Sequence, residues 1–409
     1  MAEAQRQSWQ RTLYIVFFAQ LMTAVGFSSI FPFLPLYVES LGTSTSLSLE
    51  LLAGLVFSAQ AFTMMLASPI WGALADRYGR KVMVERAAFG GAVLLLMMAY
   101  VRSAEQLVAL RAIQGFVTGT LAASNALVAA SVPRERTGYA MGLLQTALGT
   151  GVAVGPLIGG AAADAFGYRA AFYLTAALLF LAGLLVLFGV KEEFVPLEAL
   201  AETDSGFFRQ WRRILARPGI VHGYATRFLT SLGRMMLIPV APLFIQSLMT
   251  DRSHLNTVTG LVVGTASATT TLSAVWLGRL SDRMGHRRIL FPSILVAGLS
   301  YFPQSLVTNP WQLLALQALM GVALGGVIPT ISALLARYSQ EGQEGAVYGL
   351  DNSVEAAART VAPLIGAGIA LLFGLPATFV GTGLLFLATG LLVVPRFPTP
   401  ARPRQFSSD

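Results

Sequence analysis

The chain has 409 residues, of which 55% are hydrophobic and only 12% are charged, and its mean hydropathy is +0.65. Because a water-soluble domain carries about a quarter charged residues, this composition excludes a soluble globular protein. The net charge is +8, but the basic residues fall in short loops between apolar segments, which argues against a nucleic-acid-binding surface. Cysteine is absent and the three histidines show no metal-ligand spacing, so we expect neither disulfides nor a metal site.

Twelve apolar stretches are long enough to cross a bilayer, which needs roughly 20 apolar residues per helix. In the first half of the chain they are Leu13–Val38, Leu52–Leu74, Val82–Val101, Leu107–Val132, Tyr139–Ala163 and Ala170–Val190. In the second half they are Ile220–Leu248, Val258–Leu277, Ile289–Leu306, Leu313–Ala336, Ala346–Phe373 and Ala377–Val394. The predicted fold class is therefore all-α and integral to a membrane, with twelve transmembrane helices in two pseudo-symmetric six-helix bundles.

The bundles are predicted at residues 1–190 and 219–409, and a polar linker over 191–218 joins them. The stretch around Phe207–Leu215 suits an amphipathic helix on the membrane surface, and the alternative is a plain solvated tether.

Lys and Arg residues predict the orientation of the spans. With the N-terminus inside, most of them lie in cytoplasmic segments, and only Arg102, Arg169 and Arg252 lie in outer loops. The positive-inside rule therefore places both termini in the cytoplasm. Met1–Gln10 is polar and the apolar run after it is too long for a signal peptide, so we expect no cleaved leader.

A polar loop occurs twice, as GALADRYGRK at 72–81 and GRLSDRMGHR at 278–287, with Gly, Leu, Asp, Arg and Gly at the same spacing. This spacing indicates that one half of the chain was duplicated. A carboxylate at a helix end pairs well with Arg and with the positive N-terminus of a neighbouring helix. The loop is therefore either a conformational latch or a charge cluster that only ends the helix. The residues concerned are Gly72, Asp76, Arg77, Gly79, Arg80, Lys81, Asp282, Arg283 and Arg287.

Small residues form a stripe on the predicted fifth span, where Gly151, Gly155 and Gly159 are spaced by four. Such a stripe lets helices approach closely, and Pro156 removes a backbone hydrogen bond and permits a bend. The eleventh span repeats the pattern with Ala358, Ala362, Pro363 and Gly366. Close packing and a transport hinge predict the same sequence here, so both interpretations remain open.

Charged residues inside membrane spans are costly and usually face a cavity or a partner. Arg111 lies on the fourth span, Arg227 and Arg234 on the seventh, and Glu355 and Arg359 on the eleventh. Because Glu355 and Arg359 are four apart, an intrahelical ion pair is one interpretation. Arginines outnumber the deep acids even when Asp351 is included, which favours a polar cavity for an anionic or zwitterionic group. Asn125 and Asn352 are further cavity candidates, with interhelical hydrogen bonds as their alternative role.

Together these motifs resemble the major facilitator superfamily, and in particular the twelve-span drug:proton antiporter group and its MdtG-like multidrug-resistance branch. The first-span pattern GxxxxxPxxP is present as Gly26, Pro32 and Pro35, and the loop motif GxxxDRxGRK is present at 72–81. The patterns RxxQG and GxxxGPxxGG are present at Arg111–Gly115 and Gly151–Gly160.

The resemblance implies a monomeric secondary transporter of the bacterial inner membrane that works by alternating access and exports drugs or other amphipathic small molecules in exchange for protons. It also implies that Asp76 contacts the eleventh span and latches the cytoplasmic side shut in the outward-open state. Asp282 would be the symmetric partner against the fifth span, with His286 in place of a permanent cation.

The first six spans contain no deep acid, so Glu355 is the best proton carrier if protons drive transport. Burial and its Arg neighbour act on its protonation in opposite senses. A lipid or organic-anion transporter and a membrane receptor or sensor remain as alternatives. The absence of a Ser-His-Asp, HExxH or P-loop pattern argues against an enzyme, direct use of ATP or a bound cofactor.

Overall fold

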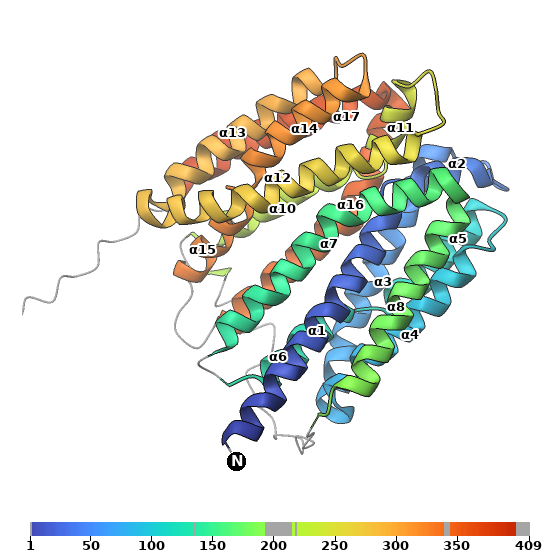
Figure 1. Cartoon of the computed structure of the whole chain (residues 1–409). Coiled ribbons are helices and arrows are strands. Elements are labelled where there is room, and N and C mark those ends of the chain that lie inside the picture. The colour runs from blue at the N-terminus through green and yellow to red at the C-terminus, as the bar shows by residue number, and fades with distance from the viewer. Residues whose placement is uncertain (1, 134–135, 193–214, 217–218, 339–343, 398–409) are drawn as a thin grey trace, which may run out of the picture.

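The computed structural model describes residues 2–133, 136–192, 215–216, 219–338 and 344–397, and all regular structure in these ranges is helical (Figure 1). Side chains are not described at positions 2–8, 73, 76, 122, 130, 344–346 and 348. The helices of the first half are α1 (Ala2–Ile30), α2 (Leu34–Leu41), α3 (Leu49–Tyr78), α4 (Arg80–Met98), α5 (Ala104–Val117), α6 (Thr120–Ser131), α7 (Thr137–Phe166) and α8 (Tyr168–Gly189). Those of the second half are α10 (Ile220–Met236), α11 (Ala241–Ser247), α12 (Leu255–Met284), α13 (His286–Gln304), α14 (Pro310–Leu324), α15 (Ile328–Tyr338), α16 (Glu344–Phe373) and α17 (Leu375–Ala388), with short helical turns at Thr389–Val393 and Val394–Arg396.

The predicted membrane class is confirmed by the helices of the described ranges. Nine candidate spans there are long and apolar enough to cross a membrane, and they coincide with all predicted spans except the third, fourth and ninth. The third corresponds to α4, which carries four charged residues in its first two turns. The fourth is the pair α5 and α6, and the ninth is α13, which begins with three basic or titratable residues. The arrangement is consistent with twelve spans.

Four predicted spans, the first, fourth, seventh and tenth, are divided into two helices each, where the sequence suggested continuous ones. Proline and glycine explain three of the breaks. Pro32 and Pro239 lie in the breaks of the first and seventh spans and lack the N–H that a continuous helix needs. Gly119 in the fourth span has φ +140°, a backbone conformation that favours glycine. The first and seventh spans, like the fourth and tenth, occupy equivalent places in the two halves.

The duplication is also visible in the tight turns between consecutive spans. Gly79 ends α3 and precedes α4 with φ +97°, and Gly285 does the same between α12 and α13 with φ +98°. Gly167 and Gly374 form a second equivalent pair, with φ values of +82° and +87°. These positive φ angles let one helix follow another without a loop.

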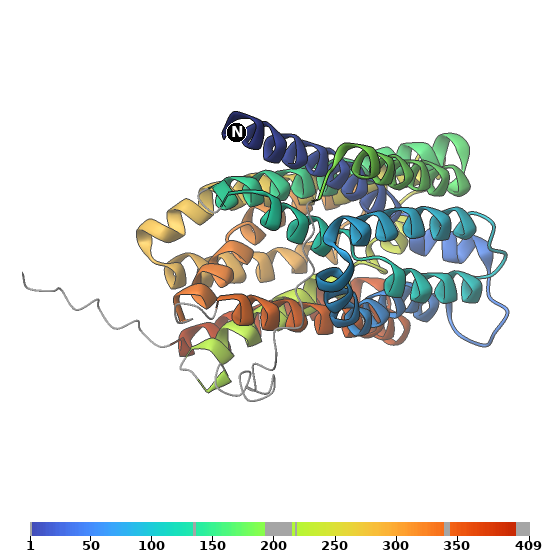
Figure 2. The same cartoon turned by 90° about the horizontal axis from the view of Figure 1, so that it is seen from below.

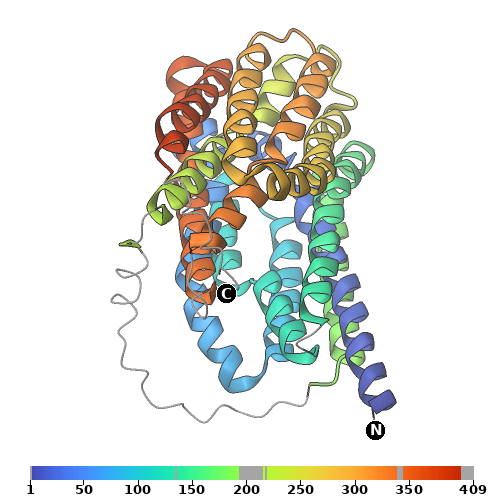
Figure 3. The same cartoon turned by 90° about the vertical axis from the view of Figure 1, so that its left-hand side faces the viewer.

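The helices of the two halves form two groups whose axes run in the same general direction (Figures 1 and 2). The groups converge at the end where α2 and α11 lie and diverge toward the end that carries the N-terminus (Figure 1). Figure 3 views the molecule from the side where they diverge. We call the converging and diverging ends the outer and inner ends, after the orientation predicted from Lys and Arg.

Two pairs of long helices pack together between the halves, α3 with α16 and α7 with α12, and the short helices α2 and α11 also meet. A Cβ added at Gly54 would lie 2.8 Å from the carbonyl oxygen of Pro363, and one at Gly260 would collide with the carbonyl of Pro156. These two contacts occupy equivalent positions in the duplicated halves. The halves are therefore in backbone contact along the outer part of both helix pairs, and the structure is open toward the inner end.

Candidate functional site

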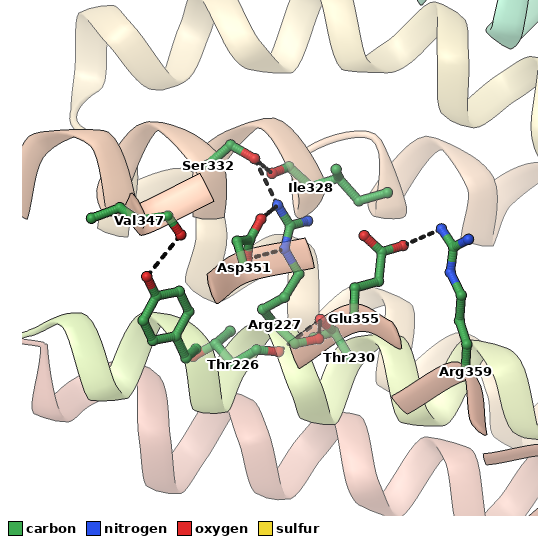
Figure 4. Close-up of polar contacts among 10 residues, drawn as sticks. Thr226, Arg227, Thr230, Ile328, Ser332, Val347, Asp351, Glu355 and Arg359 are labelled. Carbon is green, nitrogen blue, oxygen red and sulfur yellow. Dashed lines mark hydrogen bonds and ion pairs between the residues drawn. The ribbon is translucent and has the colours of Figure 1, made fainter. Parts of the chain in front are cut away.

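A network of charged and polar side chains joins α10, α15 and α16 in the second half (Figure 4). The guanidinium of Arg227 donates to both carboxylate oxygens of Asp351, over 2.9 Å from Nε and 2.8 Å from Nη2. Nη2 also donates to Ser332 Oγ over 2.7 Å. Both charged side chains are only 7% exposed. This bidentate, buried pair accounts for both charges, so the Arg227 charge is compensated within the protein.

One turn further along α16, Arg359 Nη2 donates to Glu355 Oε1 over 2.6 Å (Figure 4). This pair is far more accessible than the first, because the Arg359 side chain is 45% exposed and that of Glu355 is 23% exposed. The intrahelical pair suggested by the four-residue spacing is therefore present. Its exposure leaves the second carboxylate oxygen and most of the guanidinium free to meet another group.

Arg234 lies two turns after Arg227 on the same face of α10 and is partly buried. Its charge interacts electrostatically with those of Glu355, Arg359 and Arg227. In the part of the chain that the structure describes, no hydrogen bond or ion pair to its guanidinium occurs. Counting Arg227, Asp351, Glu355 and Arg359 with it, the cluster has one cation in excess.

The accessible members of this cluster face the space between the halves. On α16, Asn352 and Arg359 lie on the same helix face as Pro363 and Ala367, because successive members of this set are seven, four and four residues apart. Pro363 and Ala367 contact Gly54 of α3 across the two halves. Asn352 and Arg359 are exposed although they lie on this same face. Their exposure results from the divergence of α3 and α16 toward the inner end.

Arg111 of the first half is not part of this cluster. Its side chain is 2% exposed, and it donates from Nε to Val56 O and from Nη1 to Gln114 Oε1 over 3.2 and 2.8 Å. Its Nη2 and the amide nitrogen of Gln114 are buried without a hydrogen-bond partner. Asn125 on α6 likewise has a buried side-chain oxygen without a partner. Arg111 thus connects α5 with α3, and Arg111, Gln114 and Asn125 each leave a polar atom unsatisfied.

The two copies of the repeated loop lie at the inner end, where the halves are apart. The side chain of Asp76 lies outside the described residues, and Asp282, Arg283 and Arg287 are exposed. The first copy is held by Glu192, which follows α8. The backbone N–H groups of Arg80 and Lys81 donate to the carboxylate of Glu192 over 3.0 and 2.8 Å.

In the second copy, Ser281 Oγ lies 2.7 Å from His286 Nδ1. Burial lowers the pKa of His286 below its usual value, with a further lowering by the Arg337 charge, while the Asp282 charge opposes both. The residue that replaces a permanent cation in this copy is therefore kept neutral more readily than a free histidine.

The glycine stripe of α7 packs within the first half. A Cβ at Gly155 would collide with Ser28 Oγ and one at Gly159 with the carbonyl oxygen of Ser29, both on α1. Pro156 faces the other way, toward Gly260 of α12, and Pro363 of α16 faces α3. The stripe thus joins α7 to α1, and the prolines lie at the contacts between the halves.

Two polar features escaped the sequence analysis. Asp164 lies just beyond the predicted fifth span, and its carboxylate accepts hydrogen bonds from the other half. The signal in the sequence for this contact was its place one turn after Gly160, on the side of α7 that faces α12. Arg86 lies inside the predicted third span, with its guanidinium carbon 3.4 Å from the centre of the Trp71 ring. No cluster of three or more metal-ligating side chains occurs in the described ranges.

Comparison with known proteins identifies the family. The model of the Major Facilitator Superfamily matches the chain twice, over residues 16–226 and 223–409. The multidrug resistance protein MdtG of Serratia proteamaculans is 36% identical over 93% of this chain and 92% of its own length, and that of Salmonella typhimurium is 35% identical over 91% and 92%. In fold, the chain is similar to a bacterial homologue of the human lysosomal transporter Spinster in an inward-facing, unoccupied conformation, with a TM-score of 0.78, 15% identity and coverage of 96% and 99%. The predicted resemblance is confirmed: the chain belongs to the major facilitator superfamily and is a membrane transporter, not an enzyme.

Proposed function

We propose that this protein exports amphipathic small molecules, drugs among them, by alternating access coupled to protons, with a preference for substrates that carry an anionic group. Export of drugs is supported by the multidrug resistance proteins MdtG, which match over nearly the whole chain. The protein acts as a monomer in the bacterial inner membrane with both termini in the cytoplasm, in keeping with the distribution of Lys and Arg.

The observation that carries the substrate preference is the uncompensated charge of Arg234. Its neighbour Arg227 is neutralised by Asp351, whereas no partner for Arg234 occurs among the described residues. A cation in a membrane-buried site is costly unless a counter-charge meets it. A carboxylate or sulfonate on the substrate would provide that counter-charge, with Arg359 close by as a second donor.

Proton coupling is assigned to Glu355. The Glu355–Arg359 pair is more accessible than the Arg227–Asp351 pair, and an ion pair that is partly exposed is held less strongly than a buried one. A proton on Glu355 would neutralise the carboxylate and release Arg359, so protonation would change the charge that the site presents to a substrate. Substrate and proton would thereby influence each other through one side chain.

The repeated loops are assigned a latch role in the opposite, outward-open state. Asp76 would meet the inner end of α16, and Asp282 the inner end of α7, when those helices approach. The inner end is open in this structure, so these contacts would form only when the halves rock. Gly151, Gly155 and Gly159 would keep α7 close to α1 as the halves rock.

Reconstitution into proteoliposomes tests the proposal. Efflux of an anionic and a cationic fluorescent drug analogue of similar size is measured with and without an imposed pH gradient. We expect transport to be driven by the gradient. Because a charge-assisted hydrogen bond is lost, we expect Arg234→Gln to reduce transport of the anionic analogue at least about tenfold and to leave transport of the cationic analogue unchanged. Equal loss for both analogues would contradict the preference, and unchanged efflux without any gradient would contradict proton coupling.

A further inference from the structure

At the outer end, a carboxylate of the first half caps a helix of the second half. Asp164, in the last turn of α7, accepts hydrogen bonds from the backbone N–H groups of Asn256 and Thr257 over 3.1 and 2.7 Å. It also accepts one from Asn256 Nδ2 over 2.8 Å. Asn256 is 7% exposed, and one turn earlier on α7 a Cβ at Gly160 would collide with its carbonyl oxygen. The carboxylate therefore lies at a tight contact between the halves.

The cap replaces one that α12 lacks. The first N–H groups of a helix have no partner inside it and are usually satisfied by the side chain of the N-cap residue. The N-cap of α12 is His254, whose side chain makes no such bond, so the second and third N–H groups depend on Asp164. The positive end of the helix dipole adds to this attraction.

The equivalent contact on the other side of the molecule is built differently. In the duplicated frame, α3 takes the place of α12, and Leu371 of α16 takes the place of Asp164. The α3 helix caps itself, because Ser48 Oγ accepts from the N–H of Leu51. Leu371 has no polar group to offer and is 53% exposed. The duplicated interfaces share their glycine–proline contacts, but only one of them has a capping carboxylate.

We infer that Asp164 is a positioning residue of the transport cycle that holds the outer end closed by capping α12 from the other half. This inference rests on the proposed alternating access. Separation of α7 and α12 at the outer end breaks all three hydrogen bonds, exposes two uncapped N–H groups and leaves the carboxylate without its partner. The bonds therefore favour the inward-open state and must be released each time the transporter opens outward.

Distances between spin labels measure this balance without any substrate, and the absence of native cysteine makes labelling selective. One pair of cysteines, at the exposed positions Ser46 and Leu306, reports on the outer end. A second pair replaces Gly138 and Gly349, where an added Cβ meets nothing within 4 Å, and reports on the inner end. Each pair is compared in the parent protein and in Asp164→Ala, Asp164→Asn and Asn256→Ala.

We expect Asp164→Ala to raise the ratio of outward-open to inward-open molecules at least about fivefold, the loss that a missing helix cap produces. Asp164→Asn keeps one acceptor oxygen and should shift the ratio less, and Asn256→Ala, which removes one of the three donors to Asp164 and keeps both backbone donors, should shift it least. Glu39→Gln is the matched control. It removes another carboxylate at the outer end of the first half. Glu39 is exposed beside a cavity of about 250 Å³ between the halves, and in the described structure its carboxylate accepts no hydrogen bond from the other half. It should leave the ratio unchanged.

A second variant distinguishes a role of Asp164 in holding the halves together from a role in capping α12 alone. Combining Asp164→Ala with His254→Ser gives α12 a cap of its own, which should recover thermal stability while the distances stay shifted toward outward-open. If His254→Ser restores the parent distances as well, or if Asp164→Ala leaves them unchanged, the inference is wrong. Because the distances require neither drug nor proton gradient, a failure of the proposed export activity would appear only in the transport assay.

Discussion

The two ion pairs of the second half should differ strongly in what they contribute to stability. Asp351→Ala leaves the Arg227 guanidinium buried with Ser332 as its remaining side-chain partner. Breaking a buried pair from one side typically costs about 3–5 kcal/mol, because an uncompensated charge stays behind. Glu355→Gln instead disrupts a pair in which the arginine side chain is 45% exposed, where the loss should be only about 0.3–0.5 kcal/mol.

Equilibrium unfolding in mixed micelles measures both losses, with tryptophan fluorescence as the signal. The double variant Arg227→Met with Asp351→Leu removes both charges and fills similar volume, so it should recover most of the stability lost in Asp351→Ala. Two results would refute the reasoning: a loss below about 1 kcal/mol in Asp351→Ala, or no recovery in the double variant. A small loss would mean that the Arg227 charge is compensated by a group other than Asp351, and no recovery would mean that the loss in Asp351→Ala does not come from an unpaired charge.

Three further predictions follow from the helix contacts and the loops. Gly159→Leu should abolish drug efflux, because its Cβ collides with Ser29 of α1. Gly142→Leu on the same helix, where a Cβ meets nothing within 4 Å, should be active. An active, well-expressed Gly159→Leu protein would contradict this packing. Asp76→Asn should reduce transport and shift the inner-end distances away from the outward-open state, and unchanged distances with full activity would count against the latch. His286 should titrate below the usual histidine pKa of about 6.5 in NMR spectra of a variant whose other two histidines are replaced by glutamine. Because the pKa of His286 is lower in the folded protein, the residue should destabilise the folded state as the pH falls below the pKa of the unfolded chain. An unshifted or raised pKa would contradict the burial of His286.

The sequence alone determined the features that depend on local composition and on repetition. Apolar stretches of span length revealed the membrane class, because every span must present apolar side chains to lipid. The repeated loop revealed the duplication, and the same offset reappears in the turns at Gly79 and Gly285 and in the breaks at Pro32 and Pro239. The four-residue spacing of Glu355 and Arg359 was enough to predict their pair, since it concerns a single helix.

Only the tertiary structure decided which distant groups meet. Asp351 pairs with Arg227 across 124 positions of the chain, and Asp164 caps α12 across 92 and 93 positions. Such pairings depend on how far each helix is rotated and tilted against its neighbour, and hydropathy along one helix carries no information about either. The same reason explains Arg234: the sequence shows a cation within a span, but only the packing of α10 against α16 shows that it has no partner among the described residues.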